Sequence, residues 1–240
     1  MNGTPRSIRP VPFRDRTDAG RYLATKLQAY AGRANLLVLA LPRGGVPVGF
    51  EVALALHAPL DVFIVRKLGV PGHEELAIGA IASGGAQVLD QYLIRDLRIS
   101  PDEIARVITR EEVELERRER EYRGDRPPVT VAGRAVILVD DGLATGYTMR
   151  AAVAALKQEG AAETIVAVPV APPDTCESLR AEVDQVVCAV TPEPFIAVGL
   201  WYRDFRQTTD EEVHDLLARA NSVSSGRGSD DSGGQVLDEP

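Results

Sequence analysis

The chain has 240 residues, of which 45% are hydrophobic and 26% are charged, and its net charge is −8. Such a chain can bury the core of one domain, or of two small ones. The acidic balance argues against nucleic acid as the main partner, because binding to phosphates requires a basic face. No apolar run approaches the ~20 residues that span a bilayer, and residues 1–16 lack an apolar leader. We therefore expect a soluble, cytoplasmic protein with no membrane partner.

The chain contains two cysteines, Cys176 and Cys188, and neither belongs to a metal-ligand motif. Cys188 lies in an apolar run, and Cys176 opens a predicted helix. Cysteines of a cytoplasmic protein are usually reduced, so we expect two free thiols.

In the first half of the chain, apolar periodicity predicts alternating helices and strands. Two short apolar segments separated by Gly84 and Gly85 predict a hairpin. The expected elements are helix 17–32, strand 36–41, helix 46–57, strand 61–66, hairpin strands 76–83 and 86–90, and a long charged helix at about 101–123. Residues 110–126 of that helix (REEVELERREREYRGDR) are nearly all charged, so we expect it to face solvent or a partner, with i,i+4 Glu–Arg pairs.

The second half continues the same alternation. The expected elements are strand 136–139, helix 147–159, strand 164–170, helix 174–182, strand 184–190, an irregular segment 195–202 and a helix from about 209. Continuous Val, Ile and Leu strands between helices predict an α/β fold, with a mostly parallel sheet covered on both faces. We expect one domain over residues 1–220 and a disordered acidic tail over 221–240, which is rich in Ser, Gly and Asp.

One stretch, VILVDDGLATGYT (136–148), ends a buried strand on two adjacent carboxylates. Neighbouring carboxylates repel each other, so a bound group is needed to explain them. The loop after them leads into a helix, whose first N–H groups form an anion site suited to phosphate. Two carboxylates beside a phosphate can accept hydrogen bonds from sugar hydroxyls or hold a divalent cation. The pattern therefore predicts a site for a phosphorylated ribose.

This stretch resembles the phosphoribosyl pyrophosphate (PRPP) signature of the type I phosphoribosyltransferase family. The resemblance implies that Asp140 and Asp141 hold the ribose hydroxyls, and that both could contact Mg²⁺. It also implies that the following loop binds the 5′-phosphate, through Gly142, Leu143, Ala144, Thr145, Gly146, Tyr147 and Thr148. Two other interpretations are a receiver domain of a response regulator and a surface turn with two solvated acids. The later strand ends lack the Asp and Lys that a receiver needs, and a surface turn leaves Thr-Gly-x-Thr unexplained.

Two further segments resemble parts of the same family. LPRGGVPVGFEVALAL (41–56) is similar to the pyrophosphate loop of xanthine-type members, which implies that Arg43, Gly44 and Gly45 bind pyrophosphate. IVRKLGVPG (64–72) is similar to the start of the flexible catalytic loop of adenine- and orotate-type enzymes. It implies catalytic roles for Lys67 and Arg66 toward the leaving pyrophosphate, on a loop that can swing. The alternatives are an ordinary turn and an ordinary basic pair.

The chain departs from the family in its acceptor pocket. Hypoxanthine-type enzymes carry an Asp before the Thr-Gly, whereas this chain has Ala144. The segment FIAVGLWYRDFR (195–206) is similar to their base-stacking segment, which makes Phe195, Trp201 and Tyr202 candidate acceptor contacts. The acceptor itself is not identified by any of these motifs.

The resemblance implies Mg²⁺-dependent transfer of phosphoribosyl from PRPP to a nitrogenous acceptor, with release of pyrophosphate. It also implies a homodimer, which is usual in the family. A PRPP- or nucleotide-sensing regulator of the same fold is one alternative function, and hydrolysis or phosphorolysis of a ribose phosphate is another. The pair of Arg66 and Lys67 favours the enzyme, because a sensor has no leaving group to stabilise.

Overall fold

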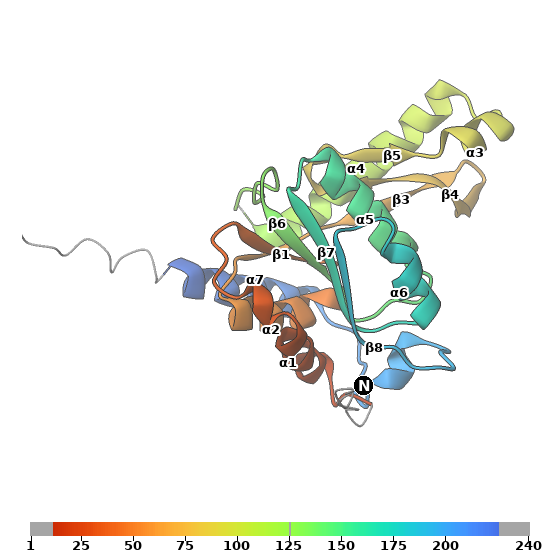
Figure 1. Cartoon of the computed structure of the whole chain (residues 1–240). Coiled ribbons are helices and arrows are strands. Elements are labelled where there is room, and N and C mark those ends of the chain that lie inside the picture. The colour runs from red at the N-terminus through yellow and green to blue at the C-terminus, as the bar shows by residue number, and fades with distance from the viewer. Residues whose placement is uncertain (1–11, 125, 226–240) are drawn as a thin grey trace, which may run out of the picture.

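The fold is built on a five-stranded sheet in which every strand pair is parallel (Figure 1). A computed structural model describes residues 12–124 and 126–225. The strand order is β2-β1-β6-β7-β8. The strands are β1 (Leu36–Ala40), β2 (Leu60–Val62), β6 (Ala135–Val139), β7 (Glu163–Val170) and β8 (Gln185–Val190). This confirms the predicted α/β class.

Helices cover both faces of this sheet, and alternate strand residues point into two separate cores. Val38 and Ile137 belong to a core with α1 (Arg16–Lys26), α2 (Gly45–Leu56) and α7 (Asp210–Ser225). Leu37 and Leu138 belong to a core with α5 (Tyr147–Gln158) and α6 (Pro173–Leu179) on the opposite face. Because both faces are buried, the central strands β1 and β6 are apolar at every position rather than at every second one.

A second, antiparallel sheet contains β3 (Val65–Val70), β4 (His73–Ala82) and β5 (Gln87–Leu89). The predicted hairpin across Gly84 and Gly85 is confirmed as β4 and β5. The predicted single strand 61–66 is wrong, because β2 ends at Val62 and β3 begins at Val65 in the other sheet. Phe63 and Ile64 between them are buried, so apolar character continues through the break and conceals it.

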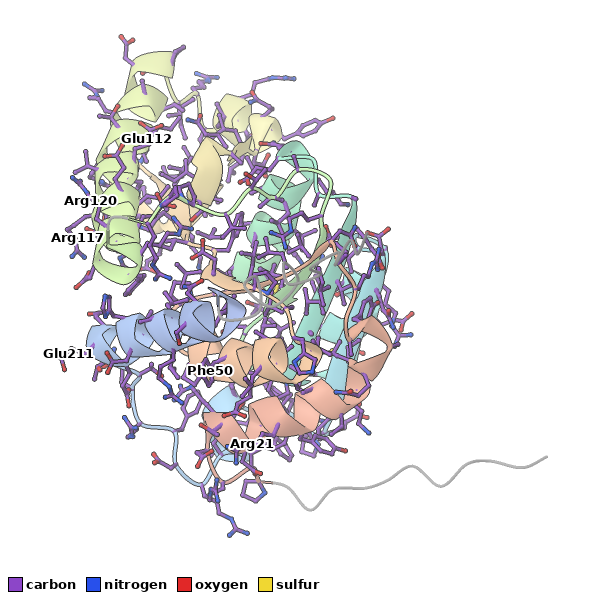
Figure 2. All side chains as sticks on the ribbon, turned by 90° about the vertical axis from the view of Figure 1, so that its left-hand side faces the viewer. Arg21, Phe50, Glu112, Arg117, Arg120 and Glu211 are labelled. Atoms are coloured by element: carbon purple, nitrogen blue, oxygen red, sulfur yellow. A yellow bond between two sulfur atoms is a disulfide. The ribbon has the colours of Figure 1, made fainter. Side chains whose placement is uncertain are left out.

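The second sheet packs between α4 (Pro101–Arg123) and α5. α4 has the predicted bounds, and a short helix that was not predicted, α3 (Gln91–Asp96), precedes it. Glu114 of α4 pairs with Arg117 and with Arg118, an i,i+4 partner, as expected. Figure 2 shows Arg117 and Arg120 pointing away from the body of the molecule. The opposite side of the helix is buried, so α4 packs on the second sheet with one side and exposes a charged face on the other.

Two predictions about the chain need correction or lie partly outside the described residues. Cys176 of α6 and Cys188 of β8 form a disulfide, so the expectation of two free thiols is wrong; sequence context could not show that these elements are neighbours. The predicted disordered tail began at residue 221, but α7 continues to Ser225, and residues 226–240 lie outside the described part.

The remaining structure includes the short 3-10 helices η1 (Gln28–Tyr30), η2 (Ser83–Gly85) and η3 (Val198–Trp201). Within the described residues, no helix is long and apolar enough to cross a membrane.

Candidate functional site

The predicted acid pair lies at the carboxyl end of β6, next to the end of β1. β1 continues to β2 on one side of the sheet, whereas β6 continues to β7 on the other, so the two strands flank a switch point in strand order. Ligands of open α/β sheets bind at such points. The backbone N–H of Asp141 donates to Oδ1 of Asp140 at 2.8 Å. Burial and the neighbouring carboxylate of Asp141 raise the pKa of Asp140 well above its ordinary range.

The predicted pyrophosphate loop packs directly on this pair. A Cβ built on Gly44 would lie 2.1 Å from Oδ2 of Asp141, and one on Gly45 would lie 2.8 Å from the carbonyl oxygen of Val139. Only glycine leaves room for the loop and the acids to meet this closely. Two motifs that are far apart in the sequence are therefore in direct contact.

The predicted phosphate loop leads into α5 through Gly146, whose φ is 74°. No side chain caps the start of α5, whereas Asp15 caps α1 and Asp90 caps α3. An uncapped helix N-terminus leaves N–H groups for an anion. Thr175 of α6 donates from its hydroxyl to the carbonyl oxygen of Ala144 at 2.8 Å, which fixes the middle of the loop. The start of α5 is thus open to an anion, whereas the N–H of Leu143, also predicted to bind the phosphate, already donates to the carbonyl oxygen of Val170 at 2.9 Å.

Arg16, which the sequence did not single out, contacts the acid pair. Its Nε and Nη2 both lie 2.8 Å from Oδ2 of Asp141. Burial raises the pKa of Asp141, and the guanidinium of Arg16 opposes that shift. No local pattern indicates this role, because an arginine after the N-cap Asp15 is also an ordinary start of a helix.

Arg43 points to another partner in this structure. Its Nη1 lies 3.6 Å from Oδ2 of Asp210, the first residue of α7. Oδ1 of Asp210 accepts a hydrogen bond from the hydroxyl of Tyr122 at 2.9 Å. The structure therefore brings Gly44 and Gly45 to the acid pair, but it places the side chain of Arg43 in a cluster with α4 and α7.

Lys67 and Arg66 lie on β3 rather than at the root of a loop. Lys67 is opposite Ala80 of β4, so the predicted swinging loop is wrong in this structure, and only Pro71 and Gly72 form the turn. Backbone pairing with β4 extends the strand through this segment. Arg66 donates from Nε and Nη2 to Oε2 of Glu111 at 2.9 and 2.6 Å, and is thus engaged by α4.

The side chain of Lys67 is exposed on a cleft of about 650 Å³ between the second sheet and the start of α5. Tyr147 and Thr148 of the predicted phosphate loop line the same cleft. Glu75 and Asp90 contribute carboxylates, and the rest of the lining consists of Leu76, Ala77, Gly79, Ala80, Val88, Leu89 and Ala151. Lys67 and the phosphate loop, predicted separately, therefore face one cavity.

The three predicted acceptor contacts have different environments. Phe195 and Trp201 stack with ring centroids 6.4 Å apart, and Nε1 of Trp201 is buried without a hydrogen-bond partner among the described residues. Tyr202 is only 6% exposed, and its hydroxyl donates to the carbonyl oxygen of Asp141 at 2.5 Å. Tyr202 therefore holds the backbone of Asp141 in place, a role that the motif alone did not indicate.

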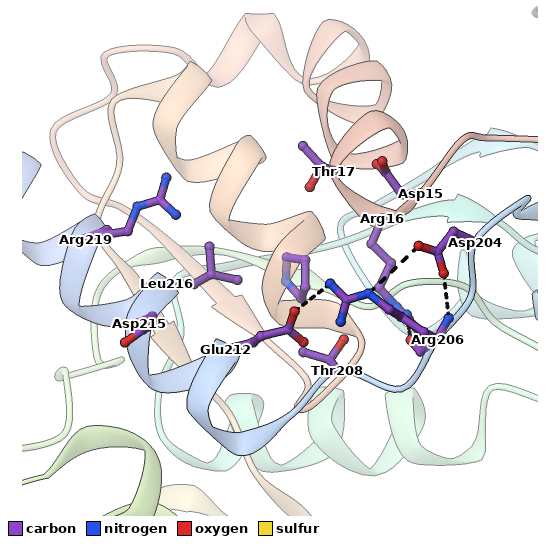
Figure 3. Close-up of a pocket in the computed structure, with 11 residues that line it drawn as sticks. Asp15, Arg16, Thr17, Asp204, Arg206, Thr208, Glu212, Asp215, Leu216 and Arg219 are labelled. Atoms are coloured by element: carbon purple, nitrogen blue, oxygen red, sulfur yellow. Dashed lines mark hydrogen bonds and ion pairs between the residues drawn. The ribbon is translucent and has the colours of Figure 1, made fainter.

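A second, mixed-charge cavity of about 320 Å³, which Arg16 also lines, lies between α1, α2 and α7 (Figure 3). Arg206 crosses it to Glu212, with Nη2 2.6 Å from Oε1. Asp15, Asp204 and Asp215 also line it. Its arginines and acids largely compensate one another, so we do not place the substrate site here.

Comparison with known proteins shows the family to which the chain belongs. The model of the phosphoribosyl transferase domain matches residues 15–202. A Mycobacterium tuberculosis protein named "Putative phosphoribosyl transferase" is 46% identical over 209 residues, which are 87% of this chain and 47% of that protein. The chain thus spans about half the length of this relative. A ribose-phosphate pyrophosphokinase of Methanopyrus kandleri is 35% identical over 136 residues, 49% of this chain and 47% of the relative.

Among solved structures, the crystal structure of TT1426 from Thermus thermophilus is similar over 86% of this chain and 98% of its own. The two chains are 44% identical, and the TM-score is 0.77. The family model covers most of the described residues, including the acid pair, the phosphate loop and Lys67. The chain therefore belongs to the phosphoribosyl transferase domain family.

Proposed function

We propose that the protein transfers the phosphoribosyl group of PRPP to a nitrogenous acceptor and releases pyrophosphate. The observation that carries this proposal is the meeting of three features at one edge of the parallel sheet. These are the acid pair Asp140–Asp141, the glycines Gly44 and Gly45 packed on it, and the uncapped start of α5. A phosphorylated sugar with a diol and a pyrophosphate presents the groups that these three features would bind.

In the proposed reaction, the bond between ribose C1 and the pyrophosphate oxygen breaks, and the oxygen keeps the electron pair. A bond from C1 to the acceptor nitrogen forms, and the proton of that nitrogen is released. Positioning and electrostatic stabilisation of the leaving group would supply most of the rate. Lys67 faces the cleft next to the phosphate loop and is the cation best placed to act on pyrophosphate.

Mg²⁺ fits this site as an ion that arrives with the substrate. Within the described residues, no group of three or more His, Cys, Asp or Glu residues could hold a metal. Two carboxylates with hard oxygen ligands suit Mg²⁺ when substrate phosphates complete the shell. When bound, Mg²⁺ would neutralise charge on pyrophosphate as it leaves. Asp140 and Asp141 are the residues that would contact it.

We place the acceptor in the cleft of about 650 Å³ that Lys67 and Thr148 line. Its walls are largely apolar, which suits the faces of a flat heterocycle. The carboxylates of Glu75 and Asp90 at its edge can accept hydrogen bonds from N–H groups of an acceptor. Phe195 and Trp201 remain a second candidate surface for such a ring.

The test is release of pyrophosphate from PRPP and Mg²⁺ in the presence of a panel of purines, pyrimidines and other amines. Acceptor-dependent release by the wild type, lost in the variant with both Asp140→Asn and Asp141→Asn, would support transfer. Release that needs no acceptor would instead indicate hydrolysis. The control is Glu116→Gln, which changes an exposed carboxylate on the outer face of α4.

A second candidate function is a PRPP- or nucleotide-sensing regulator. One observation favours it: Arg66 is bound to Glu111, which leaves Lys67 as the cation of that pair facing the cleft. Tight PRPP binding in calorimetry, with no release of pyrophosphate for any acceptor, would put this candidate first.

A further inference from the structure

Among the described residues, Arg16 lies in a contact network that the proposed reaction does not explain. Nε and Nη2 of Arg16 each lie 2.8 Å from the same oxygen, Oδ2 of Asp141. The two side chains are only 11% and 14% exposed. Charge-assisted hydrogen bonds are stronger than neutral ones, and partial burial protects this pair from screening by salt.

Two further contacts hold the guanidinium in place. Nη1 of Arg16 donates to the carbonyl oxygen of Arg206 at 2.6 Å. The guanidinium carbon lies 4.1 Å from the centre of the ring of Phe205, a cation–π geometry. All three guanidinium nitrogens of Arg16 therefore contact an acceptor, and its planar face contacts an aromatic ring. These contacts fix the side chain in one position.

The segments that supply these contacts are joined to each other. The N–H of Phe13 donates to the carbonyl oxygen of Trp201 at 2.8 Å, and the N–H of Arg203 donates to that of Phe13 at 2.8 Å. The hydroxyl of Tyr202 then donates to the carbonyl oxygen of Asp141. Asp141 is thus held at its side chain by Arg16 and at its backbone by Tyr202, from two segments that are far apart in the sequence.

These contacts give the two oxygens of Asp141 different roles. Oδ2 faces Arg16 and the backbone of Gly44, because a Cβ on Gly44 would lie 2.1 Å from this oxygen and 3.2 Å from Nε of Arg16. Among the described residues, no side chain donates a hydrogen bond to Oδ1, because both contacts of Arg16 are to Oδ2. One oxygen is therefore anchored by a side chain, and the other has no side-chain donor among the described residues.

We infer that Arg16 is a positioning residue for the ribose: it anchors Oδ2 of Asp141 so that Oδ1, beside Asp140, accepts a hydrogen bond from the ribose diol. Its positive charge also offsets one of two adjacent negative charges. Arg16 itself does not touch the ribose. This inference rests on the proposed function, because it assigns a role within the PRPP site.

This role predicts that a substitution of Arg16 weakens binding of the sugar more than binding of the phosphate. Arg16→Gln removes the positive charge and the two guanidinium nitrogens that contact Oδ2, so the carboxylate of Asp141 is no longer held in place. Ribose 5-phosphate should bind about tenfold more weakly or worse, the loss expected for hydrogen bonds to a charged group. Binding of 2-deoxyribose 5-phosphate and of inorganic phosphate should change far less. Calorimetry with these three probes on the full chain measures the difference.

Four further variants make the test specific. Arg21→Gln is the matched control, since Arg21 also lies on α1 and pairs with Glu51 at 2.9 Å, away from the site. In an Asp141→Asn background, Arg16→Gln should weaken ribose binding little further, because the anchored group is already gone. Arg16→Lys keeps the charge for the case in which Arg16→Gln does not fold. Added guanidinium should partly restore ribose binding to Arg16→Ala.

Each result decides the matter. Equal losses for all three probes, or no loss for ribose 5-phosphate, would overturn the positioning role while leaving the proposed function standing. Tighter ribose binding by the variants would show that Arg16 competes with the ligand for Asp141, and would also overturn it. Loss of the fold in both Arg16→Gln and Arg16→Lys would make Arg16 a structural residue. If the wild type binds neither PRPP nor ribose 5-phosphate, the proposed function fails, and the role of Arg16 fails with it.

Discussion

The backbone of Gly44 lies directly against the carboxylate of Asp141, so that a Cβ on the glycine would come within 2.1 Å of Oδ2. Gly44 precedes α2 and Asp141 follows β6, and their contact joins the two strand ends at the switch point of the sheet. A side chain on this glycine cannot be added without moving a carboxylate that Arg16 holds in place.

We therefore expect Gly44→Ala to weaken PRPP binding by about tenfold or more, because the displaced carboxylate loses its alignment. The measurement is calorimetric titration with PRPP and Mg²⁺. Gly124→Ala is the control: Gly124 has φ of 61° at the end of α4, with open space around it. It should lower the melting temperature through backbone strain and leave PRPP affinity unchanged. Normal PRPP binding by Gly44→Ala would contradict the assignment of this contact to the site.

The acid pair gives a prediction with opposite effects on binding and stability. Asp140→Asn together with Asp141→Asn should lower PRPP affinity at least about tenfold, or ~1.4 kcal/mol. Asp140 is buried beside a second carboxylate, so Asp140→Asn alone should keep or raise the melting temperature at neutral pH. Asp141→Asn should lower it, because Arg16 loses its ion partner. Undiminished PRPP binding by the double variant would refute the ribose assignment.

Lys67 tests catalysis against binding. A cation that acts on departing pyrophosphate matters more in the transition state than in the bound state. Lys67→Ala should therefore lower turnover on the order of a hundredfold, as loss of one charge-stabilising group does elsewhere, and weaken PRPP affinity far less. Turnover and calorimetry on the same variant measure the two effects. Lys26→Ala, at the end of α1, is the control. Equal losses of turnover and affinity would make Lys67 a binding residue.

Arg66 should behave differently from its neighbour because Glu111 already occupies it. Glu111 is buried on α4, and among the described residues Arg66→Gln leaves it paired with the more exposed Arg110 alone. We expect a lower melting temperature and a smaller loss of turnover than for Lys67→Ala. Thermal unfolding and turnover of the two variants, compared side by side, would show this. A loss of turnover equal to that of Lys67→Ala, with unchanged stability, would return Arg66 to the catalytic group.

Glu159, next to the end of α5, makes stability depend on pH. Burial, and then repulsion by Glu119, raises the pKa of Glu159 from 4.5 to about 6, and its Oε1 has no hydrogen-bond partner among the described residues. The folded state binds the proton more tightly than the unfolded state, so this group costs stability as pH rises from 4.5 to about 6.

Glu159→Gln removes this cost. It should therefore be more stable than the wild type above pH ~6, with the difference disappearing below pH ~4.5. Guanidinium unfolding of both proteins at several pH values is the measurement, and Glu116→Gln, on the exposed face of α4, is the control. A stability difference that does not vary with pH would show that the ionised carboxylate of Glu159 is not destabilised in the folded protein.

The sequence alone determined the parts of the site that are contiguous in the chain. The buried strand β6, the acids after it and the loop into α5 were all predicted, because strand, turn and helix N-terminus follow from neighbouring residues. The hairpin of β4 and β5 and the bounds of α4 were predicted for the same reason. Each depends on local periodicity, on glycines at turns or on a cap, and these signals survive without knowledge of distant neighbours.

The tertiary structure decided what meets across the chain. Arg16 reaches Asp141 over a sequence separation of 125 residues, and only the packing of α1 beside segment 201–206 brings them together. Cys176 and Cys188 became a disulfide because α6 packs beside β8. Lys67 moved from a predicted loop to a strand because β4 supplied backbone hydrogen bonds that no local pattern reveals. A single sequence records which groups a residue can offer, whereas the partners of buried charges are chosen by the packing of elements that are remote in the chain.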